Sequence, residues 1–507
     1  MNNNHSIIAE GLELDARNIV TTFETDGMRV EAVTGASIAL KTGEIIGLVG
    51  ESGSGKSVTA MSIMQLIMPP GKIESGEAYL KNVDGNILEF GFKSDEMRQV
   101  RGGKIGMVFQ EPMTSLNPVL TVGYQIQETI MLHLNLNEEQ AKERTLEIMK
   151  EVGISDPESR YSQYPQHFSG GMRQRIMIAM AIAAEPQVLI ADEATTALDV
   201  TTQAQILDLL KKLAEEKGFS IIIVTHNLGL VARYADRIYV MYGGNIVETA
   251  DKFALFKNPV HPYTKGLLDA IPRLDDRKDR RLTPIEGTPP SPINRPNRCQ
   301  FYDRCKYKEE CCNGPMPDLL DIGNDHFVRC LLSQETLTEK QNALIQAQES
   351  VREKVISDEV AIKVENLRMY FPVYKGMLKR KVAEVKALDD ISFEVYKGET
   401  LGIVGESGCG KSTLARSIMR AYKPTAGKIM YGDIDLAQLK EKQLRKIHSK
   451  IAMIFQDPFA SLDPRQTAES IVGEPLKINH STKTKDEYND RIDELLTLVG
   501  LDPDSAT

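Results

Sequence analysis

The sequence predicts an α/β protein that contains two copies of one kind of nucleotide-binding domain. Two glycine-rich loops of the same pattern, beginning at Gly50 and Gly405, each follow an apolar strand-like run and open a helix-like segment. The segments around them also repeat at an offset of about 350 residues, which indicates duplicated domains because solenoid repeats run about 20–50 residues. The chain of 507 residues is moreover too long for a single hydrophobic core.

Composition and charge exclude some classes of protein. Apolar residues make up 41% and charged residues 26% of the chain, which is ordinary for a soluble globular protein. The net charge of −10 argues against a dedicated nucleic-acid binder, which would carry a basic excess. No apolar run approaches the roughly 18 residues that span a bilayer, and the N-terminus lacks the features of a secretory signal. We therefore expect a cytosolic protein that reaches a membrane only through a partner and binds no nucleic acid.

The first glycine-rich loop follows the run Ile45–Val49. Its glycines let successive backbone N–H groups wrap phosphates, and the helix N-terminus behind it adds a positive dipole end. Lys56 can reach the β- and γ-phosphates, while Ser57 can ligate Mg²⁺. This pattern predicts a nucleoside triphosphate and Mg²⁺ as ligands. The predicted loop residues are Gly50, Glu51, Ser52, Gly53, Ser54, Gly55, Lys56 and Ser57.

The second loop follows the run Leu401–Val404, which we also expect to be a strand. Lys411 and Ser412 repeat the roles of the first lysine and serine, with Ser412 as a Mg²⁺ ligand. Further along, Ile451 to Gln456 repeats a segment of the first copy, and Gln456 is predicted to contact the nucleotide. The predicted loop residues are Gly405, Glu406, Ser407, Gly408, Cys409, Gly410, Lys411 and Ser412.

The catalytic candidates stand at the ends of predicted strands. Val188–Asp192 is an apolar run that is followed by a second carboxylate, Glu193. Because neighbouring side chains on a strand point to opposite sides, Asp192 is assigned to the Mg²⁺ and Glu193 to the attacking water as general base. His226, after another apolar run, is predicted to contact the γ-phosphate, and Gln110 to touch both Mg²⁺ and the water. The alternatives are solvated acids that cap a strand and a structural histidine.

A second corner that could bind an anion precedes the helix-like run Arg173–Ala184. A serine and two glycines at a helix start offer backbone N–H groups and a hydroxyl donor. The alternative interpretation is an ordinary helix N-cap. A domain with one phosphate loop needs no second one, unless this corner serves a nucleotide held by a different domain. The corner consists of Ser169, Gly170 and Gly171.

Together these motifs resemble those of the ATP-binding cassette (ABC) ATPases over nearly the whole chain. The resemblance implies a RecA-like core, an antiparallel β subdomain and a helical subdomain in each cassette, with ATP as the nucleotide. It also implies that Phe23 and Phe371 stack on adenine, although Tyr370 competes in the second copy. Two departures from the family pattern stand out: Phe168 and Met172 flank the signature, and Ala194 stands where proline is usual. Neither departure replaces a phosphate-contacting group, so we expect altered rates and retained binding.

A subfamily resemblance rests on the stretch after the first cassette. His261-Pro262-Tyr263-Thr264, a proline-rich stretch and a cysteine cluster are similar to the extension of peptide, oligopeptide and nickel importer ATPases. This implies ATP hydrolysis that powers uptake of a peptide-like solute in bacteria, such as a dipeptide, an oligopeptide or glutathione. The implied partners are two transmembrane permease subunits and an extracytoplasmic solute-binding protein, with the ATPase peripheral at the cytoplasmic face of the inner membrane. The rival is a soluble twin-cassette translation factor acting on ribosomes, which would carry a long basic linker and lack the extension.

Five of the six cysteines fall in one short stretch, between Cys299 and Cys330. In a reducing cytosol such clustering favours metal or cluster ligation over disulfides. The spacing lacks Cys-x2-Cys pairs, so iron–sulfur, zinc and reduced thiols all stay open. The subfamily resemblance favours a 4Fe–4S cluster on Cys299, Cys305, Cys312 and Cys330.

The predicted organisation has four segments. They are a first cassette at 1–260, a proline- and cysteine-rich extension at 261–332, a linker with a short amphipathic helix at 333–360, and a second cassette at 361–507. The second cassette stops before its own signature motif and catalytic carboxylates. We therefore expect neither intramolecular site to be complete, and the isolated chain to bind nucleotide but to hydrolyse it weakly.

Overall fold

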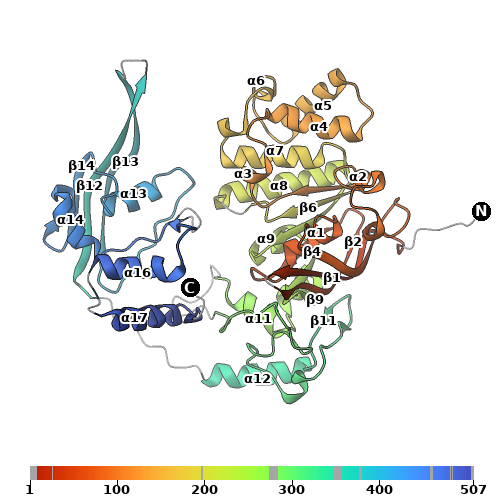
Figure 1. Cartoon of the computed structure of the whole chain (residues 1–507). Coiled ribbons are helices and arrows are strands. Elements are labelled where there is room, and N and C mark those ends of the chain that lie inside the picture. The colour runs from red at the N-terminus through yellow and green to blue at the C-terminus, as the bar shows by residue number, and fades with distance from the viewer. Residues whose placement is uncertain are drawn as a thin grey trace, which may run out of the picture. The chain divides into compact units, whose positions relative to one another are not determined.

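The structure is a computed structural model that describes residues 8–25, 27–195, 198–272, 284–347, 357–375, 380–456, 461–479, 481 and 484–503. The chain divides into two compact units, Met1–Val351 and Arg352–Thr507 (Figure 1). Within the described ranges, no helix is both long enough and apolar enough to cross a membrane.

An eight-stranded sheet forms the centre of the first unit, in the order β10-β11-β9-β8-β3-β7-β6-β5. Strands β8, β3, β7, β6 and β5 run parallel, while β9, β10 and β11 extend the sheet antiparallel. This topology confirms the α/β fold class, and the apolar runs predicted as strands in this unit are strands. Their bounds are β3 (Ile45–Val49), β5 (Ile105–Val108), β6 (Val188–Asp192), β7 (Ser220–Thr225), β8 (Arg237–Tyr242), β9 (Asn245–Asp251), β10 (Leu320–Asp321) and β11 (Phe327–Val328).

Alternate side chains of the parallel strands enter two separate cores. Leu189 and Ile221 belong to one apolar cluster, whereas Ile190 and Ile222 belong to another. Parallel strands that are buried on both faces have continuously apolar sequences, and these strands follow that rule. The helices of this part are α1 (Lys56–Ile63), α2 (Asp95–Val100), α3 (Pro112–Ser115), α7 (Gly170–Ile182), α8 (Val200–Lys217) and α9 (Leu228–Tyr234).

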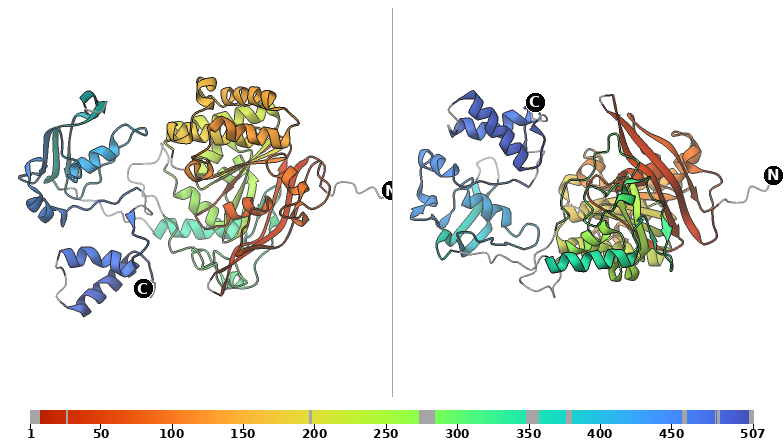
Figure 2. Two further views of the ribbon diagram at one scale, coloured as in Figure 1. Left: turned by 45° about the horizontal axis from the view of Figure 1, so that its top comes forward. Right: turned by 90° about the horizontal axis from the view of Figure 1, so that it is seen from below.

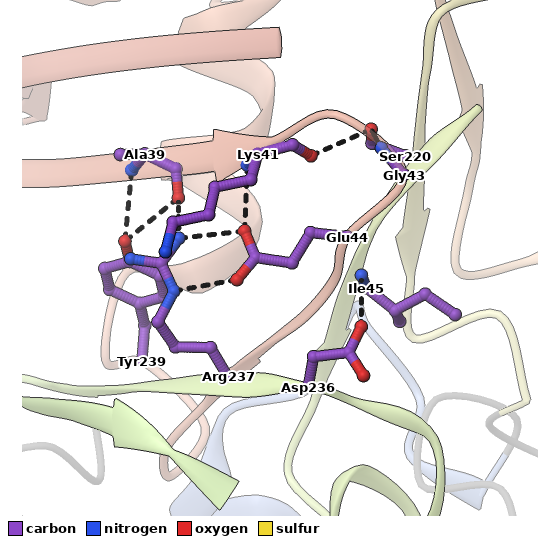
Figure 3. A network of polar contacts seen from close by, with 9 residues as sticks. All are labelled: Ala39, Lys41, Gly43, Glu44, Ile45, Ser220, Asp236, Arg237 and Tyr239. Carbon is purple, nitrogen blue, oxygen red and sulfur yellow. Dashed lines mark hydrogen bonds and ion pairs between the residues drawn. The ribbon is translucent and has the colours of Figure 1, made fainter. Parts of the chain in front are cut away.

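A three-stranded antiparallel sheet, in the order β2-β1-β4, is joined to the parallel sheet by a polar network (Figure 3). The Arg237 guanidinium, on β8, donates to both Glu44 carboxylate oxygens at 2.9 Å and to the Ala39 carbonyl at 2.7 Å. Tyr239 bonds both the N–H and the carbonyl of Ala39. These contacts secure the turn that leads into β3, the strand that carries the first glycine-rich loop. The strands are β1 (Leu12–Thr25), β2 (Met28–Lys41) and β4 (Gly71–Leu80).

Three helices gather at one end of the first unit, away from β1 and β2 (Figures 1 and 2). They are α4 (Val122–His133), α5 (Glu138–Glu151) and α6 (Pro157–Tyr161). The Thr121 hydroxyl caps α4, and Asn137 with Gln140 forms a capping box at the start of α5. A core, a small antiparallel sheet and a helical end are thus all present in this unit.

The segment after residue 260 packs onto the same unit. Its hairpin β10–β11 adds to the edge of the main sheet through β9. Helix α12 is tied to this segment by Lys340, whose Nζ lies 2.7 Å from a Glu309 carboxylate oxygen and donates to the Tyr307 carbonyl at 3.1 Å. The helices are α10 (Lys252–Lys257), α11 (Pro262–Asp269) and α12 (Gln334–Ala347).

The second unit contains a four-stranded antiparallel sheet in the order β13-β12-β14-β15, packed around Val364, Leu388 and Ile429. The helix predicted after its glycine-rich loop is present as α13. The elements are β12 (Val360–Lys375), β13 (Arg380–Tyr396), α13 (Lys411–Ile418), β14 (Ala426–Tyr431), β15 (Ile434–Asp435), α14 (Glu441–His448), α16 (Ala468–Ile478) and α17 (Lys485–Leu498).

The prediction of a strand at Leu401–Val404 is wrong. These residues form no strand, and Val404 is 92% exposed. In the first unit the corresponding strand β3 is held between β7 and β8. The described part of the second unit contains no pair of parallel strands. An apolar run that would be buried on both faces therefore has nothing to pair with.

Candidate functional site

The first glycine-rich loop turns tightly between β3 and α1. Gly55 adopts φ +101°, and a Cβ there would lie 2.6 Å from the Ala32 carbonyl oxygen. The second loop has the same shape, because Gly410 adopts φ +104° and a Cβ there would lie 2.5 Å from the Ala387 carbonyl oxygen. Only glycine fits both restrictions. Both loops therefore have a backbone whose N–H groups can surround a phosphate.

Lys56 holds the first loop together from inside. Its Nζ donates to the carbonyls of Gly50 and Glu51 at 2.9 Å, and the residue is 5% exposed. Burial lowers the pKa of Lys56, while the charges of Glu193, Asp192 and Glu51 oppose that shift. Lys411 makes the equivalent bonds in the second loop at 2.6 Å.

The side chains of Ser57 and Asp192 meet at the start of α1. Ser57 Oγ donates to Asp192 Oδ1 at 2.9 Å. Burial raises the pKa of Asp192; the Ser57 hydrogen bond and the Lys56 charge counteract it, while the Glu193 charge adds to it. A hydroxyl beside a carboxylate is a pair of oxygen ligands of the kind that Mg²⁺ prefers. The residues present therefore fit a Mg²⁺ ion.

Glu193 lies where three neighbouring strands end. Gln110 Nε2, after β5, donates to Glu193 Oε2 at 2.8 Å, and His226 Nδ1, after β7, lies 3.2 Å from Glu193 Oε1. Glu193 adopts φ +44°, which is uncommon for a residue other than glycine and is often found at active sites. Asp192 and Glu193 thus face different partners. The carboxyl ends of parallel strands are where α/β sheets bind ligands.

The corner at Ser169 begins helix α7. The Ser169 hydroxyl accepts from the Met172 N–H at 3.4 Å, so it acts as a helix N-cap. No hydrogen bond or ion pair joins Ser169, Gly170 or Gly171 to the loop at 50–57 within the described part of the first unit. The structure therefore brings Lys56, Ser57, Asp192, Glu193, Gln110 and His226 together and leaves this corner outside the group.

The two aromatic candidates lie on antiparallel strands. Phe23, on β1, is partly exposed beside Gly71, where a Cβ would come within 2.5 Å of the Phe23 ring. Phe371, on β12, meets the Tyr422 ring edge-on at a centroid distance of 5.5 Å. Gln456 is exposed.

Two residues of the extension contact the first loop, although neither was predicted from the sequence to do so. The Glu51 N–H donates to Tyr263 Oη at 2.7 Å, and the Arg304 guanidinium binds the Glu51 carboxylate at 2.7 and 3.1 Å. The only sequence feature that singles out Tyr263 is its place in the His-Pro-Tyr-Thr motif. Nothing in the sequence connects Arg304 to a residue 253 positions away.

Four cysteines of the extension line one small cavity beside Phe301 and His261. Burial raises the pKa of Cys299, that of Cys305 to about 11 and that of Cys330 to about 12. All are free thiols. In the part of the chain that the structure describes, no group of three or more His, Cys, Asp or Glu side chains is spaced as metal ligands. The lining cysteines are Cys299, Cys305, Cys312 and Cys330.

Comparison with known protein families gives two matches. The family described as "ABC transporter" matches residues 33–196 and 388–507. The family described as "Oligopeptide/dipeptide transporter, C-terminal region" matches residues 247–312.

Curated relatives align with nearly the whole chain. The oligopeptide transport ATP-binding protein OppD of Mycobacterium tuberculosis is 41% identical over 491 residues, which cover 96% of this chain and 79% of that protein. The glutathione import ATP-binding protein GsiA of Salmonella typhimurium is 40% identical over 502 residues, which cover 97% of this chain and 73% of that protein.

Solved structures align with about half of the chain. The dimeric post-hydrolysis state of the ATP-binding cassette MJ0796 bound to ADP and Pi is 29% identical, with a TM-score of 0.42 over 47% of this chain and 98% of that one. The structure of cbiO1 from Clostridium perfringens, part of the ABC transporter complex cbiONQ, is 26% identical, with a TM-score of 0.42 over 49% of this chain and 92% of that one.

Proposed function

This chain belongs to the ABC transporter family, and from that membership we propose that it is the ATP-hydrolysing subunit of a bacterial importer for a peptide-like solute. The match of residues 247–312 to the oligopeptide and dipeptide transporter region supports the solute class. The names of the relatives, for oligopeptide transport and glutathione import, support the same class. The proposed partners are two permease subunits and an extracytoplasmic solute-binding protein. Binding to the permeases would hold the ATPase peripherally at the cytoplasmic face of the membrane.

The single observation that carries the proposed chemistry is the convergence on Glu193. Its carboxylate, oriented by Gln110 Nε2 at 2.8 Å, takes the proton of the attacking water as general base. Lys56 binds the β- and γ-phosphates, and His226, beside the same carboxylate, contacts the γ-phosphate. Asp192 and Ser57 would hold Mg²⁺, which when bound neutralises charge on the phosphate oxygens.

The remaining site residues follow from the same proposal. The loops at 50–57 and 405–412 bind the phosphates of two nucleotides. Ser412 binds the second Mg²⁺, and Gln456 contacts the second nucleotide. Phe23 and Phe371 stack on the adenines. The corner Ser169-Gly170-Gly171 completes a nucleotide site held by another cassette, which agrees with the absence of a hydrogen bond or ion pair between this corner and the loop at 50–57 among the described residues. We also propose the four segments 1–260, 261–332, 333–360 and 361–507 as the domain organisation.

Replacing Glu193 by Gln tests the catalytic assignment. The amide keeps the shape of the side chain but cannot take a proton, so ATP binding should persist while turnover with the permease partners falls by about 10² or more. The matched control is Glu185→Gln, because Glu185 is also a glutamate at positive φ but pairs with Arg144 outside the site. Near-normal turnover of Glu193→Gln would contradict the assignment.

We further propose that Cys299, Cys305, Cys312 and Cys330 hold a 4Fe–4S cluster. The four side chains line one cavity, and thiolates are the ligands such clusters take. No three of the described side chains stand at metal-ligand spacing, so binding of a cluster would have to draw these thiols together. Protein purified without oxygen should be brown and contain about four irons per chain. Cys330→Ser should lose iron, whereas Cys409→Ser, in the second glycine-rich loop, should not. Stoichiometric zinc or metal-free protein would contradict the proposal.

A further inference from the structure

Every polar group of Glu51 in the first phosphate loop has a bonding partner. The N–H donates to Tyr263 Oη at 2.7 Å, and the carbonyl accepts from Lys56 Nζ at 2.9 Å. The carboxylate receives two bonds from Arg304, at 2.7 and 3.1 Å. Two of these three partners come from the extension and lie more than two hundred positions away in the sequence.

Arg304 is itself held rigidly. Its side chain is 6% exposed and donates to the Glu286 carbonyl at 3.0 Å, the Ile285 carbonyl at 3.2 Å and Tyr242 Oη at 3.2 Å. A two-pronged guanidinium–carboxylate pair fixes direction as well as distance. The Glu51 carboxylate is therefore tied to a guanidinium that has no freedom to follow it.

The segment around Arg304 also makes aromatic contacts, to Tyr242 of the cassette and to Tyr263 of the extension. The Phe301 ring meets Tyr242 at a centroid distance of 5.2 Å and Tyr263 at 5.6 Å. Cys305, directly after Arg304, lines the cysteine cavity together with Phe301. The extension thus reaches the loop by an aromatic cluster and two polar contacts.

Among the described residues, no arginine or tyrosine holds the second glycine-rich loop as Arg304 and Tyr263 hold the first. Glu406, which corresponds to Glu51, is exposed, and none of the described residues forms an ion pair with its carboxylate. The two loops therefore have the same backbone turn but different surroundings.

We propose that Arg304 and Tyr263 are positioning residues, which hold Glu51 and keep the first phosphate loop in the shape that binds nucleotide. A glycine-rich loop loses much conformational freedom when it orders around phosphates. Contacts that order the loop beforehand remove that cost from binding. The ATP affinity of the first site thus depends on the extension. This inference rests on the proposed nucleotide-binding function.

The experiment measures MgATP affinity of the full chain in a Lys411→Ala background, so that binding reports the first site. Arg304→Gln and Glu51→Gln should each raise the Kd by about fivefold to tenfold, because each removes charge-assisted hydrogen bonds. The double variant should be no weaker than the weaker single variant, since both remove the same interaction. Arg304→Lys keeps the positive charge but cannot form two parallel hydrogen bonds to the carboxylate, so its Kd should lie between those of the parent and Arg304→Gln.

The matched control is Arg298→Gln, because Arg298 lies in the same segment and pairs with Asp303 and Asn313 instead of the loop. Its Kd should stay within about twofold of the background. Tyr263→Phe removes only the hydroxyl that accepts from Glu51, so it should weaken binding even if Arg304→Gln fails to fold.

Three results would overturn the inference. The first is an unchanged MgATP affinity in Arg304→Gln or, if that variant does not fold, in Tyr263→Phe. The second is a loss of affinity in the double variant that equals the sum of the losses in the two single variants. The third is a loss of affinity in Arg298→Gln as large as that in Arg304→Gln. If the background protein binds no MgATP at all, the nucleotide-binding function fails instead. That result is distinct because the extension is intact in the background protein.

Discussion

Ser57 and Asp192, which stand 135 residues apart in the sequence, share a hydrogen bond of 2.9 Å at the start of α1. The next residue, Glu193, turns to Gln110 and His226 instead. Two adjacent carboxylates are thereby given separate surroundings, one beside a hydroxyl in the interior and one among groups at the strand ends. This separation permits one to hold a metal while the other moves a proton.

Asp192→Asn should abolish the effect of Mg²⁺ on nucleotide affinity. The amide can still accept from Ser57, but it lacks the charge that a hard cation needs. In the Lys411→Ala background, the Kd of ATP should be similar with and without Mg²⁺, whereas the parent protein should bind more tightly with Mg²⁺. Asp208→Asn, an exposed carboxylate paired with Arg233, should behave like the parent. A normal Mg²⁺ effect in Asp192→Asn would remove this residue from the metal site.

Two glycines of the first loop should respond differently to alanine. Gly53 has φ +77° and no atom within 4 Å of an added Cβ, so Gly53→Ala should destabilise the first unit by about 1 kcal/mol from backbone strain alone. Gly55→Ala adds a clash 2.6 Å from the Ala32 carbonyl and should cost clearly more, about 2–4 kcal/mol. Denaturant unfolding of the two variants measures the difference. Equal costs would show that the loop can move away from Ala32.

Arg237 should matter far more to stability than Arg233. Arg237→Met leaves the Glu44 carboxylate, whose side chain is 11% exposed, without its cation. Removing one partner of a buried pair costs about 3 kcal/mol or more. Arg233→Met breaks the pair with Asp208, whose side chain is 54% exposed, and should cost less than about 1 kcal/mol. Denaturant unfolding of both variants measures the two losses of stability. Similar losses would mean that water solvates the Glu44 carboxylate once Arg237 is removed.

The first unit should lose stability in mild acid because of His261. Burial lowers the pKa of His261 from 6.5 to about 4; the Glu248 charge opposes this shift, and the Arg329 charge adds to it. The native state therefore resists protonation, so stability is full above about pH 6.5 and falls as the pH drops towards 4. The loss between pH 7 and pH 5 should be about 2 kcal/mol.

His261→Asn is the matching variant for that test. His261 Nδ1 accepts from the Tyr263 N–H at 3.1 Å, and an asparagine oxygen can cap α11 in the same way without titrating. Its stability should change less between pH 7 and pH 5 than that of the parent. An equal change would assign the acid sensitivity to a group other than His261.

Predictions from local sequence patterns differ in outcome between the two units. The run Val188–Asp192 is a strand because β5 and β7 lie on either side of it. Leu401–Val404 has the same apolar character but no strand, since apolar composition alone supplies no hydrogen-bonding partner. Burial and strand formation are therefore properties of the neighbours as much as of the run itself.

The sequence by itself determined the turn of each glycine-rich loop and the helix behind it. These features depend on residues close together in the chain, where glycine conformations, capping and periodicity act directly. Only the tertiary structure decided that Glu193 meets Gln110, and that Arg304 binds Glu51 from 253 positions away. Such contacts depend on how strands and the extension pack, and no local pattern records which distant side chains that packing brings together.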